Sequence, residues 1–288
     1  MTRWQISHRT TYAYDDEVTD SYGVVYVTPR TLPWQQVHET GLVVDPTPAD
    51  LAEDLDYYGN TCGFFQVTRP HRELGVHATA VVDVVAPVYD QDALAAPWEQ
   101  GRPDAAAWRS VDFTMASSMV ALTPDATAYA ARSLLPGRPI GEAVTDLVHR
   151  VHGDFEYRQG ATTVTSTVED VLAERAGVCQ DFAHLLIAGL RGHGLAVRYV
   201  SGYLATTPAP GQDRVVGADA SHAWAAVRLP GAADQWLAVD PTNDQWVADR
   251  HVTVAWGRDY ADVPPVKGVI FTEAKKSTMT VAVDVVPA

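Results

Sequence analysis

The chain of 288 residues is 47% hydrophobic and 20% charged, which is typical of a globular protein with a substantial core. Its formal net charge is -15, from 36 acidic against 21 basic side chains, so its surface as a whole repels nucleic acid and anionic lipid. These values exclude nucleic acid and membranes as expected partners, and the length favours two domains.

The first residues, MTRWQISHRTTYAYDDEV, contain no apolar signal region, and no later stretch reaches the roughly 18 apolar residues of a membrane span. We therefore expect a cytoplasmic protein. The two cysteines, Cys62 and Cys179, lie far apart in the sequence. A cytoplasmic chain of this size needs no disulfide, so we expect two free thiols, with Cys62 a small buried hydrophobe.

Residues 1–90 predict an all-β domain. Runs such as RTTYAY, YGVVYVTPR, GFFQVTRP and LGVHATAVVDVV are rich in Val, Thr, Tyr and Phe and end near Pro, Gly or Asp. This pattern is typical of antiparallel strands joined by turns. The segment carries no spaced ligand set and no phosphate loop, so we expect it to serve as a scaffold or as a wall of a substrate cleft.

Residues 91–135 predict a linker with short helices, because this stretch is rich in Pro, Ala and Asp. A second domain is expected over residues 136–288. It opens with an apolar stripe at helical spacing, formed by Ile140, Ala143, Val144, Leu147, Val148 and Val151. His149 and His152 lie off this stripe, so we expect them to be solvated rather than catalytic.

The segment before Cys179 has helix start and stop signals. The letters STVE at 166–169 fit a capping box that begins at Ser166, and a short helix is expected over VEDVLAER. Gly177 is placed to end this helix, since glycine adopts a left-handed conformation without steric cost. The chain then runs directly into Cys179.

Cys179 stands at the start of a second apolar helical stripe, in the stretch GVCQDFAHLLIAGL. The first backbone N–H groups of a helix have no intrahelical partner, and the helix dipole is positive at that end. Both effects favour a thiolate over a thiol, and the free N–H groups can also hold an oxyanion. A buried and inert cysteine explains this stretch equally well, so a general base must decide between the two.

The candidate base is His222, which begins the alternating strand HAWAAVRL. A second strand, WLAVD, ends at Asp240. An antiparallel hairpin folded symmetrically about Gly231 pairs His222 with Asp240, and paired residues have Cβ atoms about 4.5 to 5.5 Å apart. The carboxylate then fixes the imidazole tautomer that a general base needs. A one-residue bulge would move the carboxylate to the wrong face.

A strand histidine and an aspartate before proline are each ordinary structural residues when taken separately. Their joint occurrence after a cysteine at a helix start predicts a Cys-His-Asp triad. The motifs GVCQDFAH, SHAW and VDPTN, in this order, resemble those of the transglutaminase-like superfamily, whose core is similar to papain. RTTYAYDDEV and DYYGNTCGFFQV resemble the N-terminal β domain of its bacterial members.

This resemblance implies an α+β protein, with an N-terminal antiparallel β domain followed by a papain-like core in which the cysteine helix packs on an antiparallel sheet. It implies Cys179 as nucleophile, His222 as base and then acid, and Asp240 as the orienting carboxylate. Tyr157 is the nearest candidate for a second oxyanion donor. Gln180 follows the nucleophile in the family pattern, and Trp224 is either a wall of the cleft or a core aromatic.

A metal site is not expected, because the cysteine and nearby polar residues show no ligand spacing such as CxxC or HExxH. The residues weighed for such a site are Cys179, Asp181, His184, His193 and His222. No dinucleotide or phosphate-loop motif stands between a strand and a helix, so no cofactor is expected.

The expected chemistry is attack of the Cys179 thiolate on an amide carbonyl to give a thioester. Hydrolysis of that thioester makes a cysteine peptidase or amidase acting on a peptide or small amide, and this is the favoured hypothesis. Transfer to an amine makes a transglutaminase, and a non-catalytic scaffold with a retained triad is a third hypothesis. The sequence leaves the substrate and the oligomeric state open.

Overall fold

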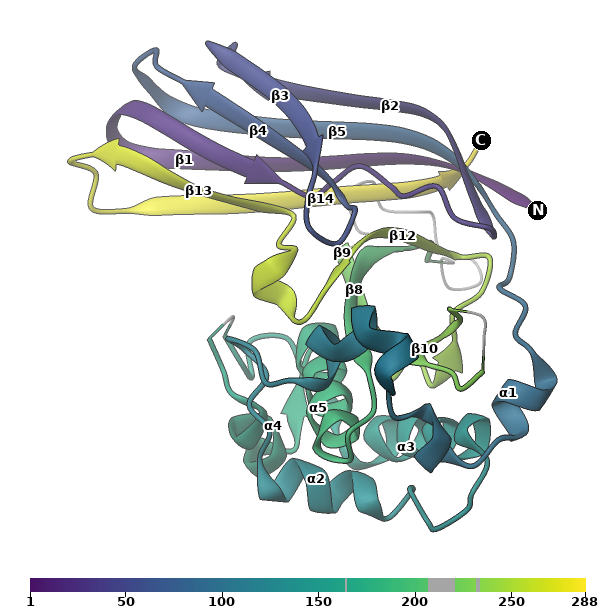
Figure 1. The fold of residues 1–288 in the computed structure, drawn as a ribbon. Coiled ribbons are helices and arrows are strands. Elements are labelled where there is room, and N and C mark those ends of the chain that lie inside the picture. The colour runs from purple at the N-terminus through teal and green to yellow at the C-terminus, as the bar shows by residue number, and fades with distance from the viewer. Residues whose placement is uncertain (164, 207–220, 232–233) are drawn as a thin grey trace, which may run out of the picture.

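The computed structural model of the protein describes residues 1–163, 165–206, 221–231 and 234–288. A large antiparallel sheet lies across a second unit of helices and strands (Figure 1). The architecture is α+β, as the sequence predicts, because alternating strands dominate the N-terminal third and helical stripes enter only after residue 90. Within the described residues, no helix is long and apolar enough to cross a bilayer.

The first sheet is assembled around one long strand, β1. It is flanked by β5 and β14 over its first half and by β4 and β13 over its second half. Strand β2 pairs with β5 and β3 pairs with β4, and all of these pairs are antiparallel. The strands are β1 (Thr2–Val25), β2 (Gln35–Asp45), β3 (Asp50–Leu55), β4 (Thr61–Val67), β5 (His71–Val84), β13 (Val266–Thr272) and β14 (Ser277–Pro287).

This sheet folds over on itself in the middle of β1. The register between β1 and β5 shifts between Ala13 and Val18, and Figure 1 shows β1 and the β13–β14 segment turning back at that level. The buried face of β5 therefore has two partners. Val76 packs in a cluster with the folded-back half of the sheet, whereas Val82 packs in the cluster shared with the rest of the chain.

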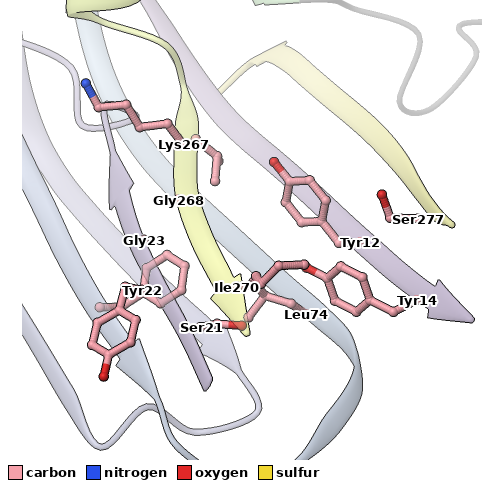
Figure 2. Close-up of a pocket in the computed structure, with 12 residues that line it drawn as sticks. Tyr12, Tyr14, Ser21, Tyr22, Gly23, Leu74, Lys267, Gly268, Ile270 and Ser277 are labelled. Atoms are coloured by element: carbon pink, nitrogen blue, oxygen red, sulfur yellow. The ribbon is translucent and has the colours of Figure 1, made fainter. Parts of the chain in front are cut away.

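A cavity of about 200 Å³ opens between the two halves of the folded sheet, next to β13 and β14 (Figure 2). Its lining includes Tyr12 and Tyr14 from the first half of β1, and Tyr22 from the second half. Gly23 makes room for the ring of Phe65, since a Cβ there would lie 2.1 Å from Cζ of that ring. This cavity is a product of the sheet's fold and lies apart from the predicted triad.

The second sheet is also antiparallel and has the order β11-β10-β9-β8-β12. Helix α5 packs against β8 and β9, and the other helices surround α5 and β10 (Figure 1). Helix α3 buries the stripe predicted for it, from Ile140 to Val151. The elements are α2 (Pro124–Ala131), α3 (Ile140–Asp154), α4 (Val168–Glu174), α5 (Cys179–Gly192), β8 (Val197–Leu204), β9 (Ser221–Arg228), β10 (Trp236–Asp240), β11 (Gln245–Trp246) and β12 (His251–Gly257).

Shorter elements connect these parts. They are helix α1 (Gln91–Ala95), the 3₁₀ segments η1 (Trp98–Gly101), η2 (Ala105–Thr114) and η3 (Tyr260–Asp262), and the two-residue strands β6 (Glu156–Tyr157) and β7 (Ala176–Gly177).

The two units share one hydrophobic core. Ile6 and Val82 of the first sheet belong to the same buried cluster as Val252 and Val254 of β12. A buried hydrogen bond of 2.9 Å also joins His8 Nδ1 to the Tyr203 hydroxyl across the junction. The chain thus buries apolar surface between its units as well as inside each of them.

The C-terminus differs from the sequence-based division, which assigned residues 136–288 to the core. Strands β13 and β14 pair with β1, so residues 266–287 extend the N-terminal sheet. Strand β1 begins at Thr2, so this pairing joins the two ends of the chain. No local sequence pattern predicts a strand partner so far away in the chain.

Helix α4 starts and stops at different residues than predicted. Its N-cap is Thr167, whose hydroxyl accepts from Asp170 N while Asp170 accepts from Thr167 N, so the capping box is one residue later than expected. Arg175 ends the helix in the left-handed conformation (φ 53°), and Gly177 belongs to β7 instead. The side chain of Arg175 is exposed and lies over the ring of Phe155.

Candidate active site

Helix α5 begins at Cys179, and its first turn is fixed by a buried carboxylate. Asp181 Oδ2 accepts from Val178 N at 2.8 Å and from the Thr162 hydroxyl at 2.6 Å. Gly177 permits this contact, because a Cβ at that residue would lie 2.8 Å from the same oxygen. The glycine is therefore required for the close approach of Asp181, and the peptide before the cysteine is held in place.

Burial shapes the charge at this helix start. Burial raises the pKa of Asp181, and the hydrogen bonds from Thr162 and Val178 partly offset that effect. Residues Asp181 to Arg191 of helix α5 are all buried, and the helix packs on the sheet through Phe182, Leu185, Leu186 and Leu190. A rigid, buried helix thus presents the partly exposed Cys179 at its end.

His222 lies near the start of β9, on the strand predicted for it. Trp224 and Ala226 of this strand belong to one buried cluster and Ala223 and Ala225 to another, which confirms the predicted alternation.

The predicted hairpin register is wrong by two residues. Val239 pairs with Ala225, so continuing the register places Asp240 opposite Trp224 and not opposite His222. The loop between the strands is centred one residue later than Gly231, which moves the pairing by two. A shift of two keeps Asp240 on the same face of the sheet, so the carboxylate is still directed towards the imidazole.

The structure brings the three predicted residues together. His222 Nε2 lies 2.7 Å from Asp240 Oδ2, and Cys179 is near enough to the imidazole to raise its pKa. Since Asp240 occupies Nε2, the nitrogen left for the sulfur is Nδ1. The side chain of Asp240 is fully buried and that of His222 is 10% exposed, so this contact chain is largely shielded from water.

Asp240 and Cys179 hold the imidazole of His222 in its charged form. Burial lowers the pKa of His222, but the hydrogen bonds and charges of Asp240 and Cys179 outweigh burial and raise the pKa to about 10. Burial raises the pKa of Asp240, yet its hydrogen bonds to His222, His251 and Asn243 hold that pKa well below its usual range. At neutral pH an imidazolium therefore lies between a carboxylate and the sulfur.

Two residues that sequence analysis missed also hold the carboxylate. His251 Nε2 lies 3.2 Å from Asp240 Oδ2, and Asn243 Nδ2 donates to the same oxygen at 2.7 Å. Ala248 N donates to His251 Nδ1, so neutral His251 carries its proton on Nε2 and donates it to Asp240. Asn243 follows Asp240 by three residues in VDPTN, but His251 lies on β12, where only the fold reveals its partner.

His222, Asp240 and His251 also place ligand-type atoms within 4.8 Å of one another. The hydrogen bonds account for this arrangement, because each imidazole directs Nε2 at a single carboxylate oxygen. Of the other residues weighed for a metal, buried His184 accepts from Tyr260 N and His193 contacts Thr127 O. The structure thus gives these two histidines separate partners.

Trp224 packs next to the imidazole rings of His222 and His251. It is completely buried, and its ring lies 6.0 Å from that of His222 and 5.3 Å from that of His251. Gly202 makes room for it, because a Cβ there would lie 2.3 Å from Trp224 Cη2 and 2.2 Å from Val252 O. Trp224 is therefore a core aromatic under the site, one of the two roles predicted for it.

Tyr157 lies beside the cysteine. Strands β6 and β7 pair Tyr157 with Gly177, two residues before Cys179. Burial, and then the charge of Cys179, raise the pKa of the Tyr157 phenol, so the hydroxyl keeps its proton at neutral pH. Gln180, the second residue of α5, directly follows Cys179 and is partly exposed.

The other sequence expectations near the site have mixed outcomes. Both cysteines are free, as predicted, but Cys62 is only partly buried, whereas a buried side chain was expected. The rings of His149 and His152 lie on the exposed face of α3, where His149 pairs with Asp244 and His152 Nδ1 contacts Thr242 O. These contacts fasten the loop that follows Asp240 to helix α3.

Comparison with known proteins places the chain among established families. Residues 4–83 match the bacterial transglutaminase-like N-terminal region, and residues 127–241 match the transglutaminase-like superfamily. The second match contains Cys179, His222 and Asp240, whereas His251 lies beyond it.

Relatives match over nearly the whole length. A Mycobacterium tuberculosis protein, described as uncharacterised, is 47% identical over 99% of this chain and 93% of its own length. A Mycobacterium leprae protein, also described as uncharacterised, is 32% identical over 93% of each chain. The crystal structure of a Cytophaga hutchinsonii protein, provisionally described as a cysteine protease, has a TM-score of 0.73 at 20% identity and covers 99% of this chain and 93% of that one. That likeness concerns the fold.

Proposed function

Because the chain belongs to the transglutaminase-like superfamily, we propose that it hydrolyses amide bonds through a thioester on Cys179. In this proposal His222 is the general base and acid, and Asp240 orients it. The observation that carries the proposal is the 2.7 Å hydrogen bond between Asp240 and His222, with Cys179 near enough to raise the pKa of that imidazole. The substrate class is a peptide or another small amide.

The first half of the reaction forms the thioester. The thiolate attacks the amide carbonyl carbon, and a carbon–sulfur bond forms as the carbonyl oxygen takes up negative charge. His222 then passes its proton to the amine nitrogen, the carbon–nitrogen bond breaks, and the amine leaves. The raised pKa of His222 supports this step, since the imidazole already carries the proton that the amine needs.

The oxyanion needs donors that are in place before charge develops. The free N–H groups at the start of α5 lie beside the sulfur, and the Tyr157 hydroxyl is the candidate second donor. Its raised pKa supports this role, because only the protonated phenol donates a hydrogen bond.

In the second half, water attacks the thioester while His222 accepts its proton. A carboxylic acid leaves and the thiolate is restored. Water is the favoured acceptor because it needs no binding site of its own, whereas an amine must be bound and protected from competing water. Transfer to an amine is therefore an outcome that the test must be able to detect.

The test combines a peptide library with a labelled primary amine. The proposal predicts free acid and released amine or ammonia, without incorporation of the label, and loss of this activity in Cys179→Ala. Cys62→Ala is the matched control, since Cys62 lies in β4 and belongs to the N-terminal sheet. Incorporation of the label would contradict the hydrolysis proposal and identify transfer to an amine as the reaction.

A scaffold with a retained triad predicts a different result. Iodoacetamide would then alkylate Cys179 and Cys62 with the same dependence on pH, and no library peptide would be cleaved. Faster alkylation of Cys179 than of Cys62 at pH 6, lost in His222→Ala, would contradict the scaffold even before a substrate is found.

A further inference from the structure

A cavity of about 410 Å³ lies at the junction of the two units, apart from the triad. One wall comes from the N-terminal unit through Trp34 and from the segment after β5 through Val85. The opposite wall comes from the second sheet through Arg198, Trp236 and Trp256. The volume falls in the range of roughly 300 to 1,000 Å³ that small-molecule sites occupy.

Arg198 is a buried cation whose guanidinium lies between two indole rings. Its Cζ is 4.3 Å from the ring centroid of Trp236 and 3.7 Å from that of Trp256. The residue is 8% exposed, and its Nε has no hydrogen-bond partner among the described residues. The rings cover the faces of the guanidinium, so an acceptor must approach along its edge, where the N–H groups lie.

A second donor in the same lining also lacks an acceptor. The indole Nε1 of Trp34 is buried and has no partner among the described residues. Trp34 is held by its backbone, since its carbonyl accepts from Val85 N at 2.9 Å. Buried donors are normally paired, because a buried donor without an acceptor loses the hydrogen bonds that it makes to water in the unfolded chain. Both donors belong to residues that line this cavity, so an acceptor bound there would lie next to both of them.

The charges around the cavity also favour an anion. Arg30 stacks on Trp256 at 3.6 Å and adds a second positive charge next to Arg198. Burial, with some repulsion from Arg30, lowers the pKa of Arg198 to about 9 despite attraction to Asp234. The acidic residue in the described lining is this Asp234, whose side chain is 80% exposed and whose Oδ1 accepts from Trp236 Nε1. The positive charge is thus buried while the negative charge faces solvent.

We propose that this cavity binds a small ligand with a carboxylate head and an apolar body. The carboxylate pairs with the edge of Arg198 and accepts from Trp34 Nε1, and the apolar body lies among the indole rings and Tyr89. Arg198 pairs with Ala226 on β9, four residues from His222, so the backbone of Arg198 lies ~13 Å along the strand from the level of His222. The proposal therefore stands whether or not the chain is a hydrolase.

Benzoate is the probe for the test, and benzamide is its neutral analogue of similar shape. Titration calorimetry of the full chain is expected to show saturable benzoate binding that is roughly tenfold or more tighter than benzamide binding, since charge-assisted hydrogen bonds are the stronger ones. Lack of saturable benzoate binding, or equal affinity for both probes, overturns the proposal. Inorganic phosphate binding as tightly as benzoate overturns the assignment to a carboxylate.

Two variants connect the binding to the cavity. Arg198→Lys keeps the charge but loses the planar fork, and is expected to weaken benzoate binding roughly tenfold. Trp34→Phe keeps an aromatic ring but loses the N–H, and is expected to weaken binding roughly three- to tenfold, which tests the proposal even if the arginine variant fails to fold.

Trp98→Phe and Cys179→Ala are the matched controls and should bind benzoate as the parent does. Trp98 Nε1 already donates to Leu135 O, outside the cavity. Benzoate binding that persists unchanged in both Arg198→Lys and Trp34→Phe would place the ligand elsewhere and overturn the proposal.

Discussion

At the scale of single residues, the candidate site depends on how many donors converge on one carboxylate. Asp240 Oδ2 is shared by His222, His251 and Asn243, and Asp240 Oδ1 accepts from Thr242 N. A buried carboxylate with this many partners cannot rotate, so it fixes both the ring orientation and the charge of His222. The acid and base roles proposed for His222 therefore rest on Asp240 more than on any other residue.

Asp240→Asn is expected to lower the pKa of His222 from about 10 towards the ordinary value of 6.5, because the charge that holds the proton is removed. Alkylation of Cys179 by iodoacetamide at pH 6 should slow by roughly tenfold or more, and any peptidase activity should fall on the order of 10²–10⁴-fold. Histidine NMR titration and alkylation rates measure the two effects, with Cys62 as an internal reference.

Asp244→Asn is the matched control for this variant. Asp244 lies in the same loop and pairs with exposed His149, a contact that an asparagine side chain can still make, so both readouts should stay close to those of the parent. An unchanged His222 titration in Asp240→Asn would show that the carboxylate does not set the charge of the imidazole.

The parts of the site that have local signals can be predicted from the sequence. Cys179 begins an apolar stripe, and His222 and Asp240 lie on strands joined by a short hairpin. The predicted register is wrong because a hairpin register depends on how its loop folds, which residue types alone do not determine. His251 was missed because its partner is defined by the packing of β12 beside β8, a pairing across a long stretch of chain.

At the scale of elements, helix α5 and the short β6–β7 pair together position the nucleophile. Strand β7 brings Gly177 against Tyr157, and Asp181 folds back onto Val178 N, so the helix start and the tyrosine share one support. The sequence has a glycine at residue 177, but a glycine that ends a helix and a glycine that makes room for a nearby side chain look the same in a sequence. Only the position of Asp181 distinguishes them.

Gly177→Ala is expected to displace Asp181, since the added Cβ would lie 2.8 Å from Oδ2 and 2.9 Å from Cβ of that residue. Overpacking of this kind costs about 1–3 kcal/mol, and the start of α5 should move with the carboxylate. The variant should therefore lose stability in urea denaturation and also lose the enhanced alkylation of Cys179.

Gly153→Ala in α3 is the control, because a Cβ there meets nothing within 4 Å. Alanine is a better helix former than glycine by about 1 kcal/mol, so this variant should be as stable as the parent or more stable. If Gly177→Ala behaved in the same way, the close approach of Asp181 would not be needed to form the helix start.

At the scale of the whole molecule, the N-terminal sheet and the helical unit are stabilised by contacts that the sequence does not show. Strands β13 and β14 return from the far end of the chain to β1, and Ile6 and Val82 share a cluster with β12. Separate patterns predict each unit, yet their junction buries histidine and arginine side chains as well as apolar ones. The junction should therefore respond to pH.

His8 lies in this junction, between the Tyr203 hydroxyl on Nδ1 and the Thr10 hydroxyl on Nε2. Burial lowers the pKa of His8 to about 4, and burial likewise lowers the pKa of His184 to about 4. The unfolded chain binds these protons near pH 6.5, whereas the folded chain binds them only near pH 4. The contribution of these two histidines to the unfolding free energy is therefore at its full value above pH 6.5 and decreases as the pH falls from 6.5 to 4.

Between pH 6.5 and 4, each such histidine should make the unfolding free energy fall by about 1.4 kcal/mol more for every pH unit of acidification. His222 adds nothing to the pH dependence of the unfolding free energy there, because its raised pKa keeps it protonated when folded and the unfolded side chain is protonated below 6.5 as well.

His8→Gln retains a donor and an acceptor but cannot titrate. Urea denaturation between pH 7 and 4.5 should give a shallower slope for this variant, by close to one proton, and an identical slope in the two proteins would mean that the junction admits water and leaves His8 free to charge.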